Sequence, residues 1–134
     1  MAKFTYRGKE LAELKAMNND EFAKLLTARQ RRSLKRGQAK KSPTLFKKIN
    51  NAIKQVEGEK LQKNVKTHKR NVVITPKMVG ITIHVHNGNE FKKMLITEKM
   101  MGHFVGEYAV TKKLVKHSSP GVGASKSSKF VSVK

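Results

Sequence analysis

The chain carries a large and unevenly placed excess of positive charge. Its 134 residues include 30 Lys and Arg against nine Asp and Glu, which gives a formal net charge of +21. No acidic residue lies between Glu21 and Glu57, and none follows Glu107. Because like charges repel one another in a compact chain, we expect the folded state to be stabilised by a partner that supplies negative charge.

Nucleic acid is the polyanion that this charge distribution favours. An anionic membrane surface would also attract lysines, but no apolar run approaches the roughly 20 residues of a membrane-spanning helix. Residues 1–8 contain no apolar block of the kind found in a secretory signal. The absence of cysteine removes disulfides and thiolate metal ligands and fits a reducing, intracellular compartment. An RNA-binding protein and a DNA-binding architectural protein are both compatible with these features.

The apolar residues divide the chain into three parts. They are concentrated between Leu45 and Tyr108, whereas residues 111–134 are rich in Lys, Ser and Gly. We predict a basic helical extension over residues 1–40, a core over 41–110 and an extended basic tail over 111–134. The expected fold class is α+β, with a small three-stranded mixed sheet packed with helices.

One helix is predicted to run from Asn18 to Gly37. Asn18 with Glu21 is typical of a capping box, and Gly37 suits the left-handed conformation that ends many helices. Five of the eight residues from Arg29 to Arg36 are Arg or Lys. Guanidinium groups bind phosphate oxygens in a bidentate fork, which favours phosphate contact over a merely solvated face. The candidate residues here are Arg29, Arg31, Arg32, Lys35 and Arg36.

A second helix is predicted between Ser42 and Gly58. Ser42 offers a capping hydroxyl, and Pro43 suits the first helical position. Apolar residues then recur at three- and four-residue spacing, which is typical of a helix with one buried face. They are Leu45, Ile49, Ala52, Ile53 and Val56. Lys47, Lys48 and Lys54 lie off this stripe and could equally face RNA or water.

Three strands are predicted for the core. Val72–Ile74 is a short β-branched run, and residues 81–86 alternate between apolar and polar, the period of a half-buried strand. Asn87-Gly88 predicts a tight hairpin turn that leads into a returning strand over residues 91–95. Lys92 and Lys93 interrupt the alternation, so this last strand is expected near an edge of the sheet.

A cationic segment precedes the first of these strands. Residues 66–70 read Lys-Thr-His-Lys-Arg, four cationic or potentially cationic residues in five. We predict a loop held rigidly at the edge of the sheet, a position from which loops often carry function.

A third helix is predicted from Thr97 to Tyr108, although it contains two glycines. Each glycine inside a helix costs about 1 kcal/mol relative to alanine, so Gly102 and Gly106 need a local reason. We expect the close approach of another backbone, either that of the sheet or that of an RNA strand beside His103.

Catalytic, metal and nucleotide sites have little support in the sequence. His84 and His86 share one strand face, but no third ligand lies at a recognisable spacing, so surface or packed imidazoles are expected. The glycines before Lys126 lack the spacing of a phosphate-binding loop. No GxSxG, HExxH or cysteine nucleophile occurs. We therefore expect no catalytic residue, no metal and no cofactor, although an RNA-modifying enzyme is a further alternative.

A series of motifs resembles the ribosomal protein S19 family, in order and along nearly the whole chain. The motifs are residues 66–70, 76–80, 85–88, 97–109 and the ending from Pro120 to Lys134. This ordered series is far more specific than any one motif. The opening Phe4–Gly8 and the segment Ala28–Arg32 are similar to the archaeal and eukaryotic branch, and the short start before Phe4 is closer to archaeal members.

The resemblance implies a structural component of the small ribosomal subunit in the cytoplasm. It implies an α+β domain bound to ribosomal RNA in the subunit head, beside protein S13, with a tail that runs toward the decoding region and the transfer RNAs. Recognition of the RNA would depend on its shape and its phosphates. The resemblance adds further contact candidates to the arginine-rich segment. They are Lys66, Thr67, His68, Lys69, Arg70, Gly102, His103, Lys112, Lys113, Lys116, His117, Lys126 and Lys129.

Overall fold

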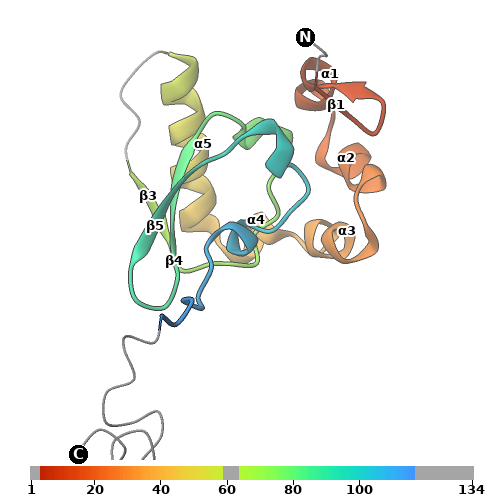
Figure 1. Cartoon of the computed structure of the whole chain (residues 1–134). Helices are drawn as coiled ribbons and strands as arrows, with labels where there is room; N and C mark the ends of the chain where they lie inside the picture. Colours follow the sequence, from red (N-terminus) through yellow and green to blue (C-terminus); the bar gives the residue numbers. More distant parts are fainter. Residues whose placement is uncertain (1–3, 59–63, 117–134) are drawn as a thin grey trace, which may run out of the picture.

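Two groups of elements, each with its own apolar core, make up the computed structural model, which describes residues 4–58 and 64–116 (Figure 1). The N-terminal group contains β1 (Thr5–Tyr6), β2 (Lys9–Glu10), α1 (Leu11–Ala16), α2 (Asn19–Leu25) and α3 (Ala28–Lys35). α4 (Gln38–Lys41) leads into the second group, which contains α5 (Pro43–Glu57), β3 (Val65–Thr67), β4 (Thr82–His86) and β5 (Phe91–Leu95). Three short 3₁₀ turns complete the described elements, η1 (Pro76–Met78), η2 (Glu98–Met100) and η3 (Val105–Tyr108).

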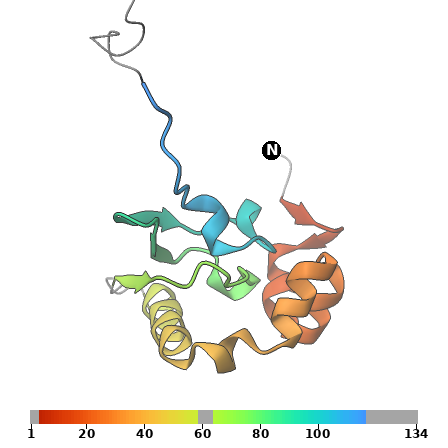
Figure 2. The ribbon, with the colours of Figure 1, turned by 90° about the horizontal axis from the view of Figure 1, so that it is seen from below.

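The second group confirms the predicted α+β class with a three-stranded mixed sheet. The strand order is β3-β4-β5, with β3 parallel to β4 and β4 antiparallel to β5. β5 is an edge strand, as its lysines indicated. α5 covers one face of the sheet (Figure 2), and the apolar stripe of this helix places Leu45, Ile49 and Ala52 in the core.

The prediction of a strand over Val72–Ile74 is wrong, because β3 provides the third strand. The segment instead bonds to residues 102–105: the Ile74 amide donates to the His103 carbonyl, and the Val105 amide to that of Val72. Val73 faces the N-terminal core, while Val72 and Ile74 face the core under the sheet. The segment 72–74 is apolar at every position, without polar alternation, because it runs between two cores and is buried on both sides.

The single helix predicted from Asn18 to Gly37 is in fact two helices. The capping box is present: the Asn18 side chain accepts from the Asn19 amide at 2.7 Å, and the Asn18 amide donates to Glu21 at 3.3 Å. The chain then becomes extended at Leu26, whose side chain enters the N-terminal core beside Phe22. Breaking the helix here turns Leu26 inward.

Two predicted turn details are also corrected. The hydroxyl of Ser42 makes no capping hydrogen bond, although α5 begins and ends where the sequence indicated. The hairpin loop has four residues, 87–90, and of the dipeptide only Gly88 has a positive φ. The Asn87 side chain accepts hydrogen bonds from the amides of Asn89 and Glu90, at 3.0 and 2.8 Å, which stabilises this longer turn.

The third predicted helix is replaced by η2 and η3 with an extended segment between them. Gly102 lies in that segment with a φ of +82°, and its amide donates to the Ile74 carbonyl. A continuous helix would use these backbone groups internally. They bond instead to the segment 72–74, so tertiary pairing overrides the helical pattern.

The N-terminal hairpin and its core were not predicted. Arg7 and Gly8 both have positive φ, which suits the tight turn between β1 and β2. Leu14, Phe22 and Leu26 pack against Val73 and Met101, so the N-terminal group contacts the remainder of the chain through buried side chains. Among the described residues, no helix is long and apolar enough to cross a membrane.

Candidate nucleic-acid interface

Two adjoining open hollows gather cationic side chains from both groups of elements. The first is lined by Arg29, Arg32 and Arg36 of α3, together with Lys41 and Lys69. The second is lined by Lys41, Lys48, Lys66, His68 and Lys69, among others. The two hollows share Lys41, Ser42 and Lys69, and no acidic residue lines either of them within residues 4–58 and 64–116. We define the basic surface as Arg29, Arg32, Arg36, Lys41, Lys48, Lys66 and Lys69.

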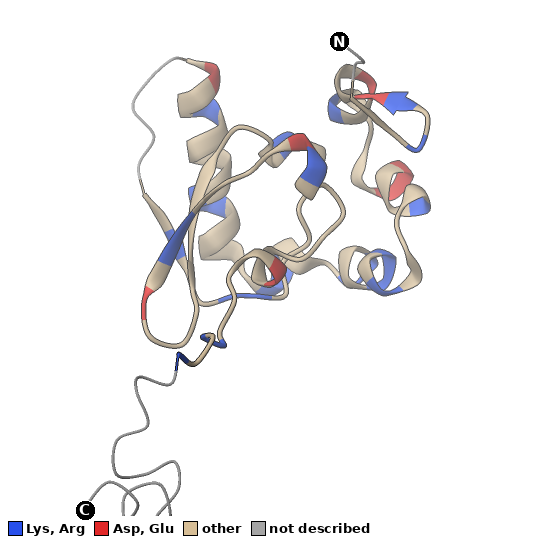
Figure 3. Cartoon of the chain, viewed as in Figure 1, with Lys and Arg blue, Asp and Glu red and all other residues tan. Residues whose placement is uncertain are grey.

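The cations of the basic surface carry charge that the protein does not neutralise. All seven are exposed, and none forms an ion pair with another residue in the part of the chain that the structure describes. Figure 3 shows α3 with Lys and Arg but no acidic residue, whereas the neighbouring α2 carries acidic residues as well as a basic one. Unpaired cations held this close together favour an anionic partner with several charges.

The α3 candidates do not all lie on this surface. Arg29, Arg32 and Arg36 follow a spacing of three and four residues and therefore share one face of the helix. Lys35 is exposed but lines neither hollow. Arg31 points into the protein, where its guanidinium donates to the carbonyls of Ala23 at 3.2 Å and Leu26 at 2.8 Å. Arg31 thus supplies the Leu26 carbonyl with a donor at the end of α2 and adds a second donor to the Ala23 carbonyl, which already accepts from the Leu26 amide.

The segment 66–70 is only partly the predicted loop. Lys66 and Thr67 belong to β3, and Thr67 is 7% exposed, so its side chain faces the core. The Thr67 hydroxyl accepts a hydrogen bond from the Lys69 amide at 2.9 Å. Lys66, His68 and Lys69 are exposed. β3 and the Thr67 hydroxyl therefore position these side chains at the edge of the sheet.

Arg70 connects three parts of the second group. Its guanidinium donates to the carbonyl of His86 at 2.8 Å, to that of Gly106 at 2.7 Å and to that of Ala109 at 2.6 Å. The end of β4, η3 and the segment after η3 are joined by this one half-buried side chain. Three of the five donors available on a guanidinium are aimed at backbone oxygens rather than at solvent.

The close approach of another backbone, expected at both glycines, is present at Gly106, whereas the atoms that approach Gly102 belong to side chains. A Cβ atom on Gly106 would lie 2.8 Å from both the Cβ and the carbonyl oxygen of Arg70. A Cβ atom on Gly102 would lie 2.7 Å from the Tyr6 hydroxyl and 2.9 Å from a methyl group of Leu26. The approaching groups thus come from the Arg70 loop and from the N-terminal group, rather than from the sheet.

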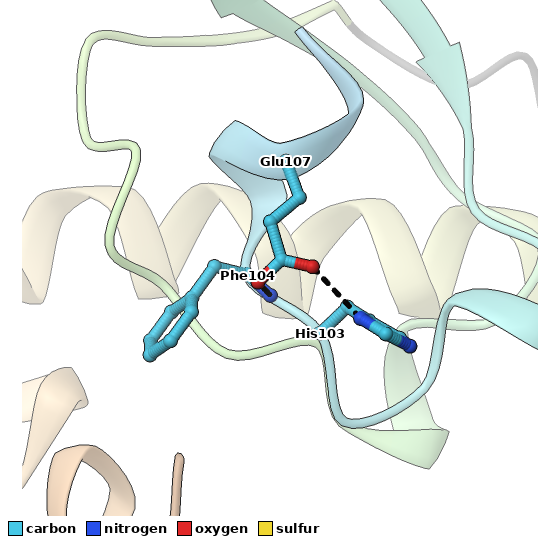
Figure 4. A network of polar contacts seen from close by, with 3 residues as sticks. All are labelled: His103, Phe104 and Glu107. Carbon is cyan, nitrogen blue, oxygen red and sulfur yellow. Dashed lines mark hydrogen bonds and ion pairs between the residues drawn. The ribbon is translucent and has the colours of Figure 1, made fainter. Parts of the chain in front are cut away.

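His103 is exposed beside a carboxylate. Its Nδ1 lies 2.7 Å from Glu107, whose other oxygen accepts a hydrogen bond from the Phe104 amide at 3.3 Å (Figure 4). Burial, and then the charge of Glu107, raises the pKa of the neighbouring Tyr108 above its ordinary value. His103 thus has a carboxylate partner, unlike the cations of the basic surface.

The remaining candidates lie after η3. Lys112, Lys113 and Lys116 are exposed on a segment without regular secondary structure. His117, Lys126 and Lys129 lie outside the described residues. In the described ranges, no group of three or more His, Cys, Asp and Glu side chains comes together in a way that could hold a metal ion.

Two cations of the basic surface were missed or left undecided by sequence reasoning. The sequence patterns predict no RNA contact for Lys41, and they leave open whether Lys48 faces RNA or water. The signal that could have found them is the absence of any acid between Glu21 and Glu57. That signal marks the whole stretch without indicating which side chains the fold brings together.

Comparison with known proteins gives consistent results along the chain. Residues 32–117 match the family model of Ribosomal protein S19. Over 131 residues, which are 98% of this chain and 91% of the relative, the sequence is 47% identical to small ribosomal subunit protein uS19 of Saccharolobus solfataricus.

Proposed function

The chain belongs to the ribosomal protein S19 family, in its archaeal type, and on this premise we propose that it binds small-subunit ribosomal RNA in the subunit head through the basic surface. Membership makes it a structural constituent of the small subunit, which is not a class of enzymes. The observation that carries the RNA proposal is the gathering of seven exposed, unpaired cations without an acidic residue.

The proposed recognition depends on fixed positions for phosphate-binding groups. A folded RNA presents phosphates at set distances, so a rigid protein surface with matching cations can select one site without reading many bases. The arginines of α3 would supply bidentate contacts, and the lysines would act as point charges. Arg31, Arg70 and Gly102 make their contacts inside the protein, and we propose that they act as positioning residues.

We extend the proposal to the tail and to neighbouring components. Six lysines and no acid follow Glu107, and residues 110–116 are all exposed. Together with the family membership, these features support a tail near the decoding site and the transfer RNAs, with protein S13 as a neighbour. On this proposal the protein acts in the cytoplasm, as part of the ribosome.

Removing three cations from the centre of the basic surface should weaken RNA binding. For the variant with Arg32, Lys41 and Lys69 changed to Gln, we expect at least about tenfold lower affinity for a head-domain RNA transcript at moderate salt. The slope of log affinity against log salt should fall by about two to three units, because each lost phosphate contact removes close to one. Filter binding over a salt series measures both quantities.

A charge-matched control separates the basic surface from general charge. Lys15, Lys24 and Lys54 are exposed and lie outside both hollows, so their change to Gln should affect binding much less. Equal losses in the two variants would contradict a localised interface.

In cell lysates separated on sucrose gradients, the wild-type protein should sediment with small subunits. Its recovery chiefly in nucleoid fractions would contradict the ribosomal proposal and favour DNA binding.

Deleting residues 117–134 tests the tail separately. We expect near-normal incorporation of the shortened protein into small subunits, because the basic surface and both described cores remain. Retention of transfer RNA by these subunits should fall, which filter binding of labelled transfer RNA measures. Complete loss of incorporation would instead show that the tail is needed for assembly.

A further inference from the structure

The outer face of the three-stranded sheet lies opposite α5 and has an unusual composition. Strand alternation turns Val65, Ile83, Val85 and Met94 toward the core. The opposite side chains form the outer face. They are Lys66 and His68, then Thr82, His84 and His86, then Phe91, Lys93 and Leu95. This face contains three imidazoles, a phenyl ring and two lysines but no acidic residue; the nearby Glu90 belongs to the hairpin loop.

Three rings form a cluster at one end of this face. The ring centroids of His68 and His86 are 4.4 Å apart, and the Phe91 ring lies 5.1 Å from His68 and 5.0 Å from His86. The plane of the Phe91 ring lies at 77° to that of His68 and at 69° to that of His86, and the ammonium of Lys66 lies 5.6 Å from the Phe91 centroid. None of the three rings belongs to either apolar core.

The rings remain accessible although they contact one another. Phe91 is 36% exposed, His68 is exposed and His86 is half-buried. Aromatic faces interleaved with cations suit single-stranded nucleic acid, because bases stack on the rings while the cations contact phosphates. A double helix offers no free base faces along its length and would gain only the phosphate contacts. The charge and the ring geometry therefore favour unpaired bases over a duplex.

We propose that the outer face of the sheet binds an unpaired stretch of RNA, with a base stacked on the His68–His86–Phe91 cluster and phosphates near Lys66 and Lys93. The ribosomal source of this RNA rests on the function proposed above. Lys66 and His68 also line the second hollow of the basic surface, so the two surfaces adjoin. The basic surface holds phosphates, and the outer face adds contact with the bases themselves.

Binding of the full-length protein to two RNA probes tests this inference. One probe is a single-stranded dodecamer with a central 2-aminopurine, and the other is a hairpin duplex of the same composition. Stacking should change the 2-aminopurine fluorescence of the single strand. Phe91→Leu keeps an apolar side chain but removes the ring, and it should weaken binding of the single strand by about tenfold while leaving the duplex unchanged.

Two further variants control for damage to the fold. Leu95→Ala changes an exposed residue on the same strand and face without removing a ring, and it should bind both probes like the wild type. His68→Leu alters the cluster outside the β4–β5 hairpin and should weaken binding of the single strand more than binding of the duplex. Thermal unfolding by circular dichroism shows whether each variant is folded. Wild-type binding by folded Phe91→Leu and His68→Leu variants would overturn the proposal.

A cross-linking experiment in assembled subunits identifies the occupant of the face. Photoreactive benzoylphenylalanine in place of Phe91 should cross-link to RNA. Cross-linking to protein alone would overturn the proposal in favour of a protein neighbour. These outcomes are separate from the ribosomal proposal, which depends on sedimentation with small subunits. If the protein did not sediment with small subunits but still bound the single strand in preference to the duplex, the ribosomal proposal would fail and the stacking proposal would stand.

Discussion

Replacing Arg70 with Ala should lower the free energy of unfolding of the free protein by about 3–4 kcal/mol. The guanidinium donates to three backbone carbonyls, at 2.8, 2.7 and 2.6 Å, and these carbonyls come from segments far apart in the sequence. A hydrogen bond from a charged donor contributes about 1.5–3 kcal/mol, and each carbonyl left without a partner adds a desolvation cost. Urea unfolding followed by circular dichroism measures the change.

Two variants show whether the effect comes from the hydrogen-bonding fork. Arg70→Lys keeps the charge but loses the fork, so it should recover only part of the lost stability. Lys69→Ala removes an exposed neighbouring cation and should change stability by no more than about 0.5 kcal/mol. If Arg70→Ala unfolded like the wild type and only RNA affinity fell, Arg70 would be a phosphate contact, as the family resemblance first implied.

The second large effect is expected for Gly106→Ala, at about 2–3 kcal/mol of lost stability. The new methyl group would lie 2.8 Å from the Cβ and the carbonyl oxygen of Arg70. These atoms belong to the backbone region of Arg70 and move only with the chain, so the overpacking cannot be relieved by a side-chain rotation. The Gly106 amide also donates to the Arg70 carbonyl at 2.9 Å, and moving the chain would weaken this bond.

Gly58→Ala is the matched control for this substitution. Gly58 also has a negative φ, and a Cβ there would meet only the Lys54 carbonyl at 3.3 Å and that of Gln55 at 4.0 Å. Its cost should stay below about 1 kcal/mol. The double variant Gly106→Ala with Arg70→Ala should not be rescued, because alanine keeps the Cβ atom that the new methyl group meets. Equal stability of the Gly106 and Gly58 variants would contradict the close-approach account.

Local patterns predicted the elements whose residues follow one clear period. The helix after Ser42 and the strand over residues 82–86 were found because a stripe or an alternation is complete within about 15 residues or fewer, and the strand over residues 91–95 was found from the turn dipeptide before it. The predictions that failed concern segments with long-range partners. Residues 72–74 and 102–105 bond to each other across about 30 positions, and no local period records such a pairing.

The same difference between local pattern and long-range contact applies to the candidate RNA-contact residues. Composition identified the arginine-rich segment and the 66–70 segment as cationic, and the family resemblance pointed to phosphate contact. Neither composition nor the resemblance could separate two kinds of cation. Arg29, Arg32 and Lys69 line the basic surface, whereas Arg31 and Arg70 donate hydrogen bonds to backbone carbonyls. An arginine that binds phosphate and one that supports a loop have the same side chain, and only their neighbours distinguish them.

The sequence by itself indicated an anionic partner, because its charge excess and its acid-free stretches do not depend on conformation. It also determined the family, because the ordered motifs extend along the whole chain. Only the tertiary structure decided which cations share one surface, which arginines are turned inward and which rings meet on the outer face of the sheet. Those relations depend on contacts between residues far apart in the chain, and such contacts form only when both cores are packed.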